Sequence, residues 1–150
     1  MKILTYPNKI LEKKAKKIKK ALDPEIQALA KNMMAILKEA DGAGLAAPQV
    51  GKLLRLCVIQ NDGEIFALIN PKITSYSREK EIGEEGCLSF PGKFLLIKRS
   101  KKVKVRFLNE KGVETKLKTD GLLARIIQHE IDHLDGILFI ERAKKWKKKI

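Results

Sequence analysis

Apolar residues recur at helical spacing along residues 24–40, and this is the strongest periodic signal in the chain. Asp23 is a suitable N-cap, Pro24 suits the first helical turn, and Gly42 stands where helices commonly end. The pattern predicts a helix over residues 24–41 with one face directed at a hydrophobic core. The residues expected on that face are Ile26, Leu29, Ala30, Met33, Ile36, Leu37 and Ala40.

The middle of the chain changes to a strand-like pattern. Residues 53–60, 64–70 and 102–119 are rich in β-branched and apolar side chains and are separated by turn-forming residues. The last of these segments contains Asn109 and Gly112 at its centre, which predicts a hairpin that turns there.

Helical spacing returns in "DGLLARIIQHEIDHLDG", residues 120–136. Either Asp120 or Thr119 is the expected cap, and Gly136 lies just past the expected end. This helix is apolar on almost every side, which is typical of a buried helix. The order of elements predicts an α+β fold in which antiparallel sheets wrap this helix, with the N-terminal helix packed outside. Since no repeat or linker divides the chain, we expect one domain over residues 1–150.

Composition agrees with a globular protein, since 44% of the 150 residues are hydrophobic and 33% are charged. No apolar run reaches the roughly 18–20 residues that a membrane span needs, and the N-terminus lacks the pattern of a secretory signal. We therefore expect a cytoplasmic protein without membrane contact, in which the two cysteines are free thiols or metal ligands.

The net charge of +14 is concentrated in two lysine-rich segments, residues 11–20 and the C-terminal tail, residues 142–150. Such segments favour either a polyanionic partner such as RNA or a solvated lysine surface of the kind found in heat-adapted proteins. For the first segment we favour the solvated surface, because it is interleaved with Leu11, Ala15 and Ile18. For the tail both interpretations stay open.

The motif "HEIDH" contains His129 and His133, which are the only two histidines of the chain. Residues four apart share one face of a helix, so both imidazoles can bind the same ion. Glu130 projects close to that ion without ligating it, where it can take a proton from water and later return it to a leaving group. Two histidines and a glutamate in a buried helix are costly without such a role, so the motif predicts a metal site.

The third ligand follows by elimination. The extended motif H-E-x-x-H-x-x-G-x-x-H would require a histidine where this chain has Phe139. The downstream carboxylates, Asp135 and Glu141, lack a predicted helix to carry them to the site. Cys57 lies in an apolar strand and is better explained as a packing residue, which leaves Cys87 in the glycine-flanked loop "EEGCLSFPG". Three protein ligands (Cys87, His129 and His133) and an open position for water are typical of a catalytic ion.

The segment "DGAGLAAPQV" is either a glycine-rich turn or part of the same site. A hydrolytic site needs a donor for a developing oxyanion. The amide of Gln49 is a candidate, and a backbone N–H near Cys87 is a second.

Three stretches together resemble the peptide deformylase family: "GAGLAAPQ" (42–49), "EGCLS" (85–89) and "QHEIDH" (128–133). Their order and spacing also fit, and the resemblance covers essentially the whole chain. It implies removal of the N-formyl group from the N-terminal formyl-methionine of nascent polypeptides, with release of formate.

The resemblance also implies roles for particular residues. Cys87, His129 and His133 would hold the ion, usually Fe²⁺, with Zn²⁺, Ni²⁺ or Co²⁺ able to replace it. Glu130 would act as general base and then acid, and the Gln49 amide and the Leu88 N–H would stabilise the oxyanion. Gly44 and Gly86 would align the substrate backbone as an added strand. The methionine pocket would be formed by Leu88, Phe94, Leu122, Arg125, Ile126 and His129.

Two other functions fit the sequence less well. A metallo-endopeptidase is disfavoured because Phe139 replaces a ligand, and an RNA-binding module with a structural metal would need four ligands where the chain offers three. If the tail at residues 142–150 binds a polyanion, our hypothesis is that it holds the enzyme near ribosomal RNA, where the substrate emerges. The sequence leaves the oligomeric state open, with a monomer as the default.

Overall fold

The computed structural model describes the backbone of residues 1–147 and the side chains of residues 1–143. Its strands pair only in antiparallel fashion, in a five-stranded sheet of order β1-β2-β3-β6-β7 and a two-stranded sheet, β4-β5. This confirms the predicted α+β class with antiparallel sheets. In chain order the elements are η1 (Lys9–Glu12), α1 (Pro24–Ala40), β1 (Gly44–Ala46), η2 (Ala47–Val50), β2 (Leu56–Asn61), β3 (Glu64–Tyr76), β4 (Lys80–Cys87), β5 (Phe90–Ser100), β6 (Lys102–Leu108), β7 (Glu114–Asp120), α2 (Gly121–Leu134) and α3 (Phe139–Lys147).

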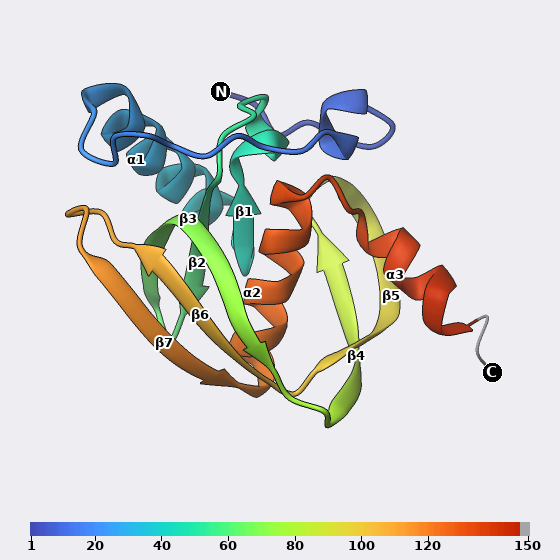
Figure 1. The fold of residues 1–150 in the computed structure, drawn as a ribbon. Coiled ribbons are helices and arrows are strands. Elements are labelled where there is room, and N and C mark those ends of the chain that lie inside the picture. The colour runs from blue at the N-terminus through green and yellow to red at the C-terminus, as the bar shows by residue number, and fades with distance from the viewer. Residues whose placement is uncertain (148–150) are drawn as a thin grey trace.

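Helix α2 lies between the two sheets, and α3 lies on the far side of β5 (Figure 1). The inward side chains of the five-stranded sheet, such as Val105 and Phe107, pack with Ile127 and Ile131 of α2 in one buried cluster. Only the first turn of the helix departs from the expected burial, since Leu122 is 71% exposed. Asp120 occupies the N-cap position but its side chain makes no capping bond. Gly136 has a φ of +72° and lies against the Glu12 carbonyl, where a Cβ atom would approach to 2.6 Å.

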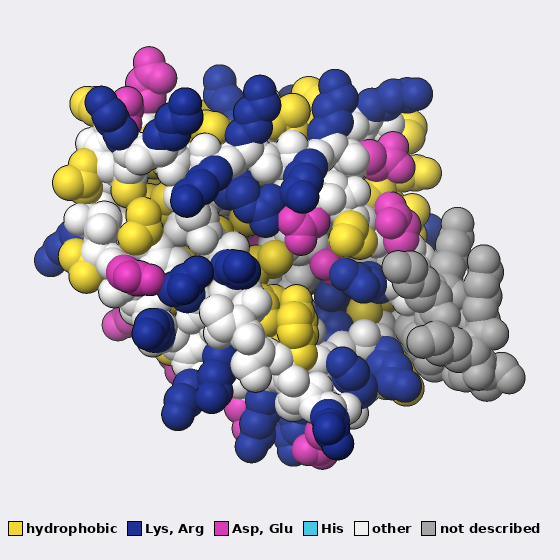
Figure 2. Space-filling view, viewed as in Figure 1, with side chains coloured by type: hydrophobic (Ala, Val, Ile, Leu, Met, Phe, Trp, Pro, Cys, Tyr) yellow, Lys and Arg dark blue, Asp and Glu magenta, His cyan; other side chains and the backbone are white. Residues whose placement is uncertain are grey.

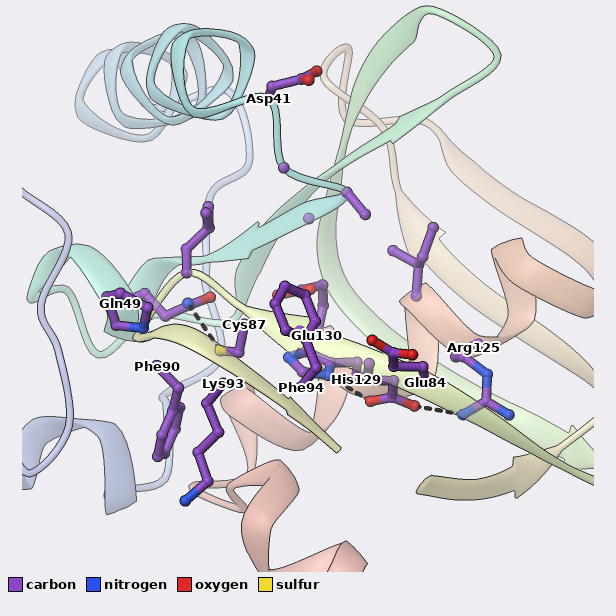
Figure 3. Close-up of a pocket in the computed structure, with 18 of the residues that line it drawn as sticks. Asp41, Gln49, Glu84, Cys87, Phe90, Lys93, Phe94, Arg125, His129 and Glu130 are labelled. Atoms are coloured by element: carbon purple, nitrogen blue, oxygen red, sulfur yellow. Dashed lines mark hydrogen bonds and ion pairs between the residues drawn. The ribbon is translucent and has the colours of Figure 1, made fainter. Parts of the chain in front are cut away.

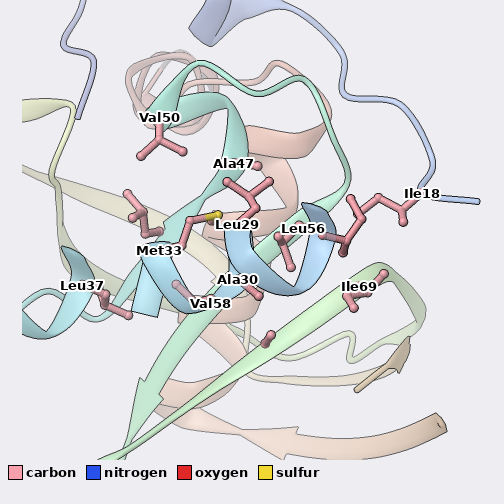
Figure 4. Close-up of a cluster of buried hydrophobic side chains, with 13 residues drawn as sticks. Ile18, Leu29, Ala30, Met33, Leu37, Ala47, Val50, Leu56, Val58 and Ile69 are labelled. Atoms are coloured by element: carbon pink, nitrogen blue, oxygen red, sulfur yellow. The ribbon is translucent and has the colours of Figure 1, made fainter. Parts of the chain in front are cut away.

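Helix α1 packs on β2 and β3 and encloses a second buried cluster (Figure 4). The Asp23 side chain accepts a hydrogen bond from the Glu25 N–H, as expected of the cap. The helix ends at Ala40, and its C-cap, Asp41, adopts the left-handed conformation with φ 52°, one residue before the predicted Gly42. A short polar side chain tolerates that conformation. The buried stripe is narrower than predicted, because Ile36 is half-buried and Ala40, at the end of the helix, is exposed.

Two elements were missed from the sequence. Residues 80–100 form the β4–β5 hairpin, so Cys87 is the last residue of a strand and not part of a loop as predicted. The segment escaped notice because β4 has charged residues and glycines where a half-buried strand usually alternates apolar and polar side chains. The second element is α3, which was not predicted and which includes Glu141.

The basic tail predicted over residues 142–150 is only partly described. Residues 142–147 belong to α3, whereas the side chains from residue 144 onward and the whole of residues 148–150 lie outside the described part of the chain. Within the described residues, no helix combines the length and hydrophobicity that crossing a membrane requires.

Candidate active site

The end of β4 and one face of α2 bring Cys87, His129 and His133 together. One ligand atom from each residue lies within 4.8 Å of the other two. The Cys87 Sγ is 3.3 Å from the His133 Nε2, and the two imidazole rings meet edge to face with centroids 5.0 Å apart. The three residues chosen from the sequence therefore converge on one point, although Cys87 is more than forty positions away from the two histidines in the chain.

The chemistry of this trio fits a divalent transition-metal ion. Burial lowers the pKa of His133 well below its ordinary value, which keeps the imidazole neutral and able to bind a metal. A thiolate and two imidazoles suit iron or zinc. Phe139, at the position where the extended motif requires a histidine, is buried against Phe90. The carboxylate candidate Asp135 pairs instead with Arg55 at 2.8 Å.

His129 is oriented by a residue that the sequence analysis missed. Its Nδ1 lies 2.8 Å from the Glu85 Oε1, a contact that directs the other ring nitrogen toward Cys87 and His133. Burial would raise the pKa of Glu85, but hydrogen bonds from His129 and Arg99 outweigh it and lower that pKa to about 2. Burial likewise opposes protonation of His129, yet its hydrogen bonds to Cys87 and Glu85 raise its pKa to about 10 when no ion is bound.

A buried ion-pair network extends from Glu85 behind the trio. Arg99 bonds both carboxylate oxygens of Glu85, at 2.6 and 3.0 Å, and also reaches Asp132 at 2.8 Å. Arg142 of α3 binds the same Asp132 at 2.8 and 3.0 Å, and Arg125 of α2 binds Glu85 at 2.7 Å. We name this set the buried network. One signal for the buried network was available in the sequence, because Asp132 is a charged residue in an otherwise apolar helix and therefore needs a partner.

Glu130 faces the trio and is 4% exposed. Its Oε1 is buried and has no hydrogen-bond partner among the described residues, while its Oε2 packs against Gly44. A Cβ atom on Gly44 would come within 2.5 Å of that oxygen, so only glycine fits there. Burial raises the pKa of Glu130 to about 7, with the charge on His129 acting in the opposite direction. A carboxylate with this pKa can accept and release protons near neutral pH.

Gln49, in η2, directs its amide nitrogen at the Cys87 sulfur (Figure 3), at 3.8 Å. The orientation of the amide is fixed because its Oε1 accepts from the Ala46 N–H at 2.9 Å and its Nε2 donates to the Ser89 Oγ at 3.0 Å. Ser89 in turn donates to the Leu4 carbonyl at 2.7 Å. Ser89 was not singled out from the sequence, although it lies in the "EGCLS" motif.

A pocket of about 510 Å³ opens onto these residues. All the residues expected to contact substrate line it: Gly44, Gly86, Leu88, Phe94, Leu122, Arg125 and Ile126, together with Gln49, Cys87, His129 and Glu130. The Phe94 ring is 64% exposed and lies over Gly86. Besides Glu85, three charged residues of the lining were not predicted from the sequence: Asp41, Glu84 and Lys93 (Figure 3). Because Arg125 also donates to the Glu81 and Ile97 carbonyls, it ties α2 to the β4–β5 hairpin.

The chain is similar to known proteins along almost its full length. A family model described as polypeptide deformylase matches residues 1–149. A peptide deformylase of Natranaerobius thermophilus is 46% identical over 145 residues, which cover 96% of this chain and 92% of that protein. The crystal structure of a peptide deformylase from Thermotoga maritima is 40% identical and superposes with a TM-score of 0.91 over 94% of this chain and 95% of that one. A Synechococcus elongatus peptide deformylase solved in complex with actinonin is 41% identical, also with a TM-score of 0.91, over 95% of this chain and 78% of that one. The chain belongs to the polypeptide deformylase family.

Proposed function

We propose that this protein is a peptide deformylase, which hydrolyses the formamide bond of N-formylmethionyl nascent polypeptides and releases formate. Family membership and the similarity to peptide deformylases support the reaction class. The observation that carries the assignment is the position of Glu130. This buried carboxylate lines the pocket beside a cluster of one thiol and two imidazoles, and one of its oxygens has no hydrogen-bond partner among the described residues.

Cys87, His129 and His133 would hold one divalent ion, for which we propose Fe²⁺, with Zn²⁺, Ni²⁺ or Co²⁺ as replacements. When bound, such an ion acts as a Lewis acid that polarises the formyl oxygen and lowers the pKa of water. The contact of His129 with Glu85 would favour the tautomer in which its other ring nitrogen is free to bind a metal.

Glu130 would take the proton from the attacking water and then deliver it to the departing amine. Its raised pKa of about 7 suits both steps, since the carboxylate is a stronger base than an exposed one and its protonated form remains accessible. Among the described residues, none makes a hydrogen bond to the Glu130 Oε1 that would compete with a water molecule.

Gln49 and the N–H of Leu88 would donate to the oxyanion that develops on the formyl group. The Gln49 amide is held by Ala46 and Ser89 before any substrate arrives, so its orientation costs little during the reaction. Leu88 follows Cys87, at the point where pairing between β4 and β5 shifts register.

Substrate would bind in the pocket between β1 and β4, with Gly44 and Gly86 aligning its backbone as an added strand. The methionine side chain would contact Leu88, Phe94, Leu122, Arg125, Ile126 and His129. We further propose that residues 1–150 act as a single catalytic domain, as a monomer in the cytoplasm, and that the tail at residues 142–150 contacts ribosomal RNA.

The test is formate release from a formyl-Met tripeptide by protein purified without oxygen and analysed for metal. Glu130→Gln should lower kcat about 10²–10⁴-fold while metal content and the circular dichroism spectrum stay unchanged. Cys87→Ala should lose both rate and metal. Glu39→Gln, on the exposed surface of α1, is the matched control and should keep the full rate.

Each failure of this test has a separate meaning. A fully active Glu130→Gln protein would refute the general-base role alone. A metal-loaded wild-type protein that releases no formate, or that cleaves unformylated peptides internally, would refute the proposed function.

A further inference from the structure

The outward face of the five-stranded sheet carries cations at alternating positions. Along β6 the side chains of Val103, Val105 and Phe107 are buried, and the residues between them are exposed. Strand β7 shows the same alternation less strongly, with its lysines exposed. We name these cations, with the exposed lysine of β3 that faces them, the basic sheet face: Lys72, Lys102, Lys104, Arg106, Lys116 and Lys118.

Strand register places like charges directly opposite one another on this face. Lys72 faces Arg106, which also faces Lys116 on its other side. In the neighbouring row Lys104 faces Lys118. Cations at directly opposed positions repel each other and weaken strand pairing. Among the described residues, the basic sheet face makes a single ion pair, Arg106 with Glu114 at 3.6 Å between exposed side chains, and such a pair contributes little.

A solvated, heat-adapted surface does not account for this arrangement. Surfaces of that kind organise lysine and glutamate into ion pairs of mixed sign. Five of the six cations of the basic sheet face instead stand opposite another cation, while Lys102 faces Asp120, in a chain that has 32 Lys and Arg against 18 Asp and Glu. The facing cations lower the stability of the fold and do not contribute to its packing, so we expect that they serve to bind a partner.

A groove continues the basic sheet face toward the N-terminal segment. It has a volume of about 750 Å³, and its lining includes Lys14 and Lys17 from that segment together with Lys72 and Arg106. Figure 2 shows Lys and Arg side chains gathered over the region of β6 and β7 and over the N-terminal segment above it. The lysines of residues 11–20, which the sequence analysis assigned to a merely solvated surface, therefore extend the same positive area.

We propose that the basic sheet face and this groove bind the phosphate backbone of RNA without sequence preference. Strands lie about 4.8 Å apart and alternate residues along a strand lie about 6.8 Å apart, so the cations form a rigid two-dimensional array. Contacts between cations and phosphates carry no sequence information, so a surface dominated by lysine and arginine is expected to bind RNA without sequence preference. Among the described residues, neither β6 nor β7 carries an exposed large hydrophobic side chain that would insert into a lipid surface, which favours RNA over a membrane.

The proposed surface is separate from the candidate active site. No residue of the basic sheet face or its groove lines the substrate pocket, so RNA and a peptide can be bound together. The identity of the RNA rests on the proposed function: a deformylase of nascent chains would meet ribosomal RNA where its substrates emerge.

The test compares two triple variants that lose the same charge and keep the complete C-terminal tail. In the face variant, Lys72→Gln, Lys104→Gln and Lys118→Gln remove cations that make no ion pair among the described residues. In the control, Lys31→Gln, Lys38→Gln and Lys98→Gln remove exposed lysines from α1 and β5. Binding of a fluorescein-labelled RNA hairpin is measured by anisotropy over a range of salt concentrations.

The face variant should raise Kd on the order of tenfold to hundredfold and reduce the slope of log Kd against log salt by about 2 to 3. The control should keep both the affinity and the slope close to those of the wild type. The face variant should also melt at the same or a higher temperature than the wild type, because repulsion is relieved, which separates lost binding from unfolding. Equal weakening in both triple variants would overturn the proposal, as would face-dependent binding to phosphatidylserine vesicles without binding to RNA.

Measuring formate release shows whether a negative result contradicts the RNA-binding proposal or the proposed deformylase function. Both triple variants should deformylate a formyl-Met tripeptide at the wild-type rate. If the metal-loaded wild type releases no formate while RNA binding still depends on the face, the proposed function fails and the RNA surface stands without its ribosomal assignment. If formate release is normal and the face variant binds RNA with the same Kd as the wild type, the RNA proposal alone fails.

Discussion

Glu85 and Asp132 of the buried network are each in contact with Arg99, whereas Lys104 and Lys118 of the basic sheet face stand opposite each other in solvent. Both regions are rich in charge, and both depend on strand register for their geometry. They differ in burial: the side chain of Arg99 is 4% exposed, and the lysines of β6 and β7 are exposed.

The comparison shows how burial decides which charges must be paired. In the interior an unpaired charge loses its hydration without compensation, so Glu85, Asp132 and the arginines around them occur only as pairs. On the sheet surface water and salt screen the repulsion between facing lysines, so the fold tolerates an arrangement it could not bury. Charge in the buried network therefore serves to orient His129, while charge on the basic sheet face is left free for a partner.

The largest effect is expected from breaking the buried network at its centre. Arg99→Met leaves Glu85 and Asp132 without their shared counter-ion, and we expect a loss of about 3–5 kcal/mol in the free energy of unfolding. Arg106→Met is the matched control on the basic sheet face and should change stability by no more than about 0.5 kcal/mol. Urea unfolding followed by circular dichroism measures both. If Arg99→Met and Arg106→Met lost the same free energy of unfolding, burial would not be what makes charge pairing necessary.

The next largest difference between the buried network and the basic sheet face is expected in the effect of acid on the free energy of unfolding. The pKa of Glu85 is about 2 in the folded chain against an ordinary value of 4.5, so its contribution is complete above pH 4.5 and is lost as the pH falls toward 2. The difference corresponds to about 3 kcal/mol of unfolding free energy in metal-free protein. The basic sheet face is defined by Lys and Arg alone, so it holds no carboxylate that could account for this fall. Unfolding measured from pH 6 to pH 2 after chelation should show a steeper decline in the wild type than in Glu85→Gln, and parallel curves would contradict the role of Glu85.

A smaller effect is expected from Glu85→Gln on metal affinity. The amide keeps the shape of the side chain but weakens its hold on the His129 Nδ1, and losing such a partner typically costs tenfold to a hundredfold in affinity, or about 1.4–2.7 kcal/mol. Chelator competition with Zn²⁺ measures this change. Glu84→Gln, one residue away on the exposed side of β4, is the control and should leave the affinity unaltered.

The sequence predicted the parts of the structure that depend on local periodicity. The helix at residues 24–40 and the hairpin at residues 102–120 follow from spacing and turn residues, and the motif "HEIDH" points to a metal site on its own. The β4–β5 hairpin was missed because Glu85 occupies a buried position, where a strand pattern requires an apolar side chain. That charge is tolerated only because Arg99 and Arg125 reach it from β5 and α2, which are distant in sequence.

Dependence on partners that are distant in sequence also explains which residues of the candidate site were not predicted. Cys87, His129 and His133 could be chosen as candidate metal ligands from their side-chain chemistry, from the spacing of the histidines and by elimination of other residues. Glu85, Ser89 and Arg99 are ordinary polar residues whose importance arises from contacts across the fold, such as the bond from Ser89 to the Leu4 carbonyl, 85 positions away. Local sequence patterns carry no record of such contacts.

The smallest effect is expected where the basic sheet face is altered at one position. Lys104→Glu would turn the opposed pair with Lys118 into an attractive one, which should raise the free energy of unfolding by about 0.2–1 kcal/mol. Lys31→Glu on α1 removes the same charge without an opposed cation and should raise it less. Because the pair is exposed, the advantage of Lys104→Glu should fade in 1 M salt, where the screening length is about 3 Å. A variant that is more stable yet binds RNA more weakly would mean that the facing cations lower stability in the service of binding, whereas a less stable Lys104→Glu protein would mean that the lysine supports the fold.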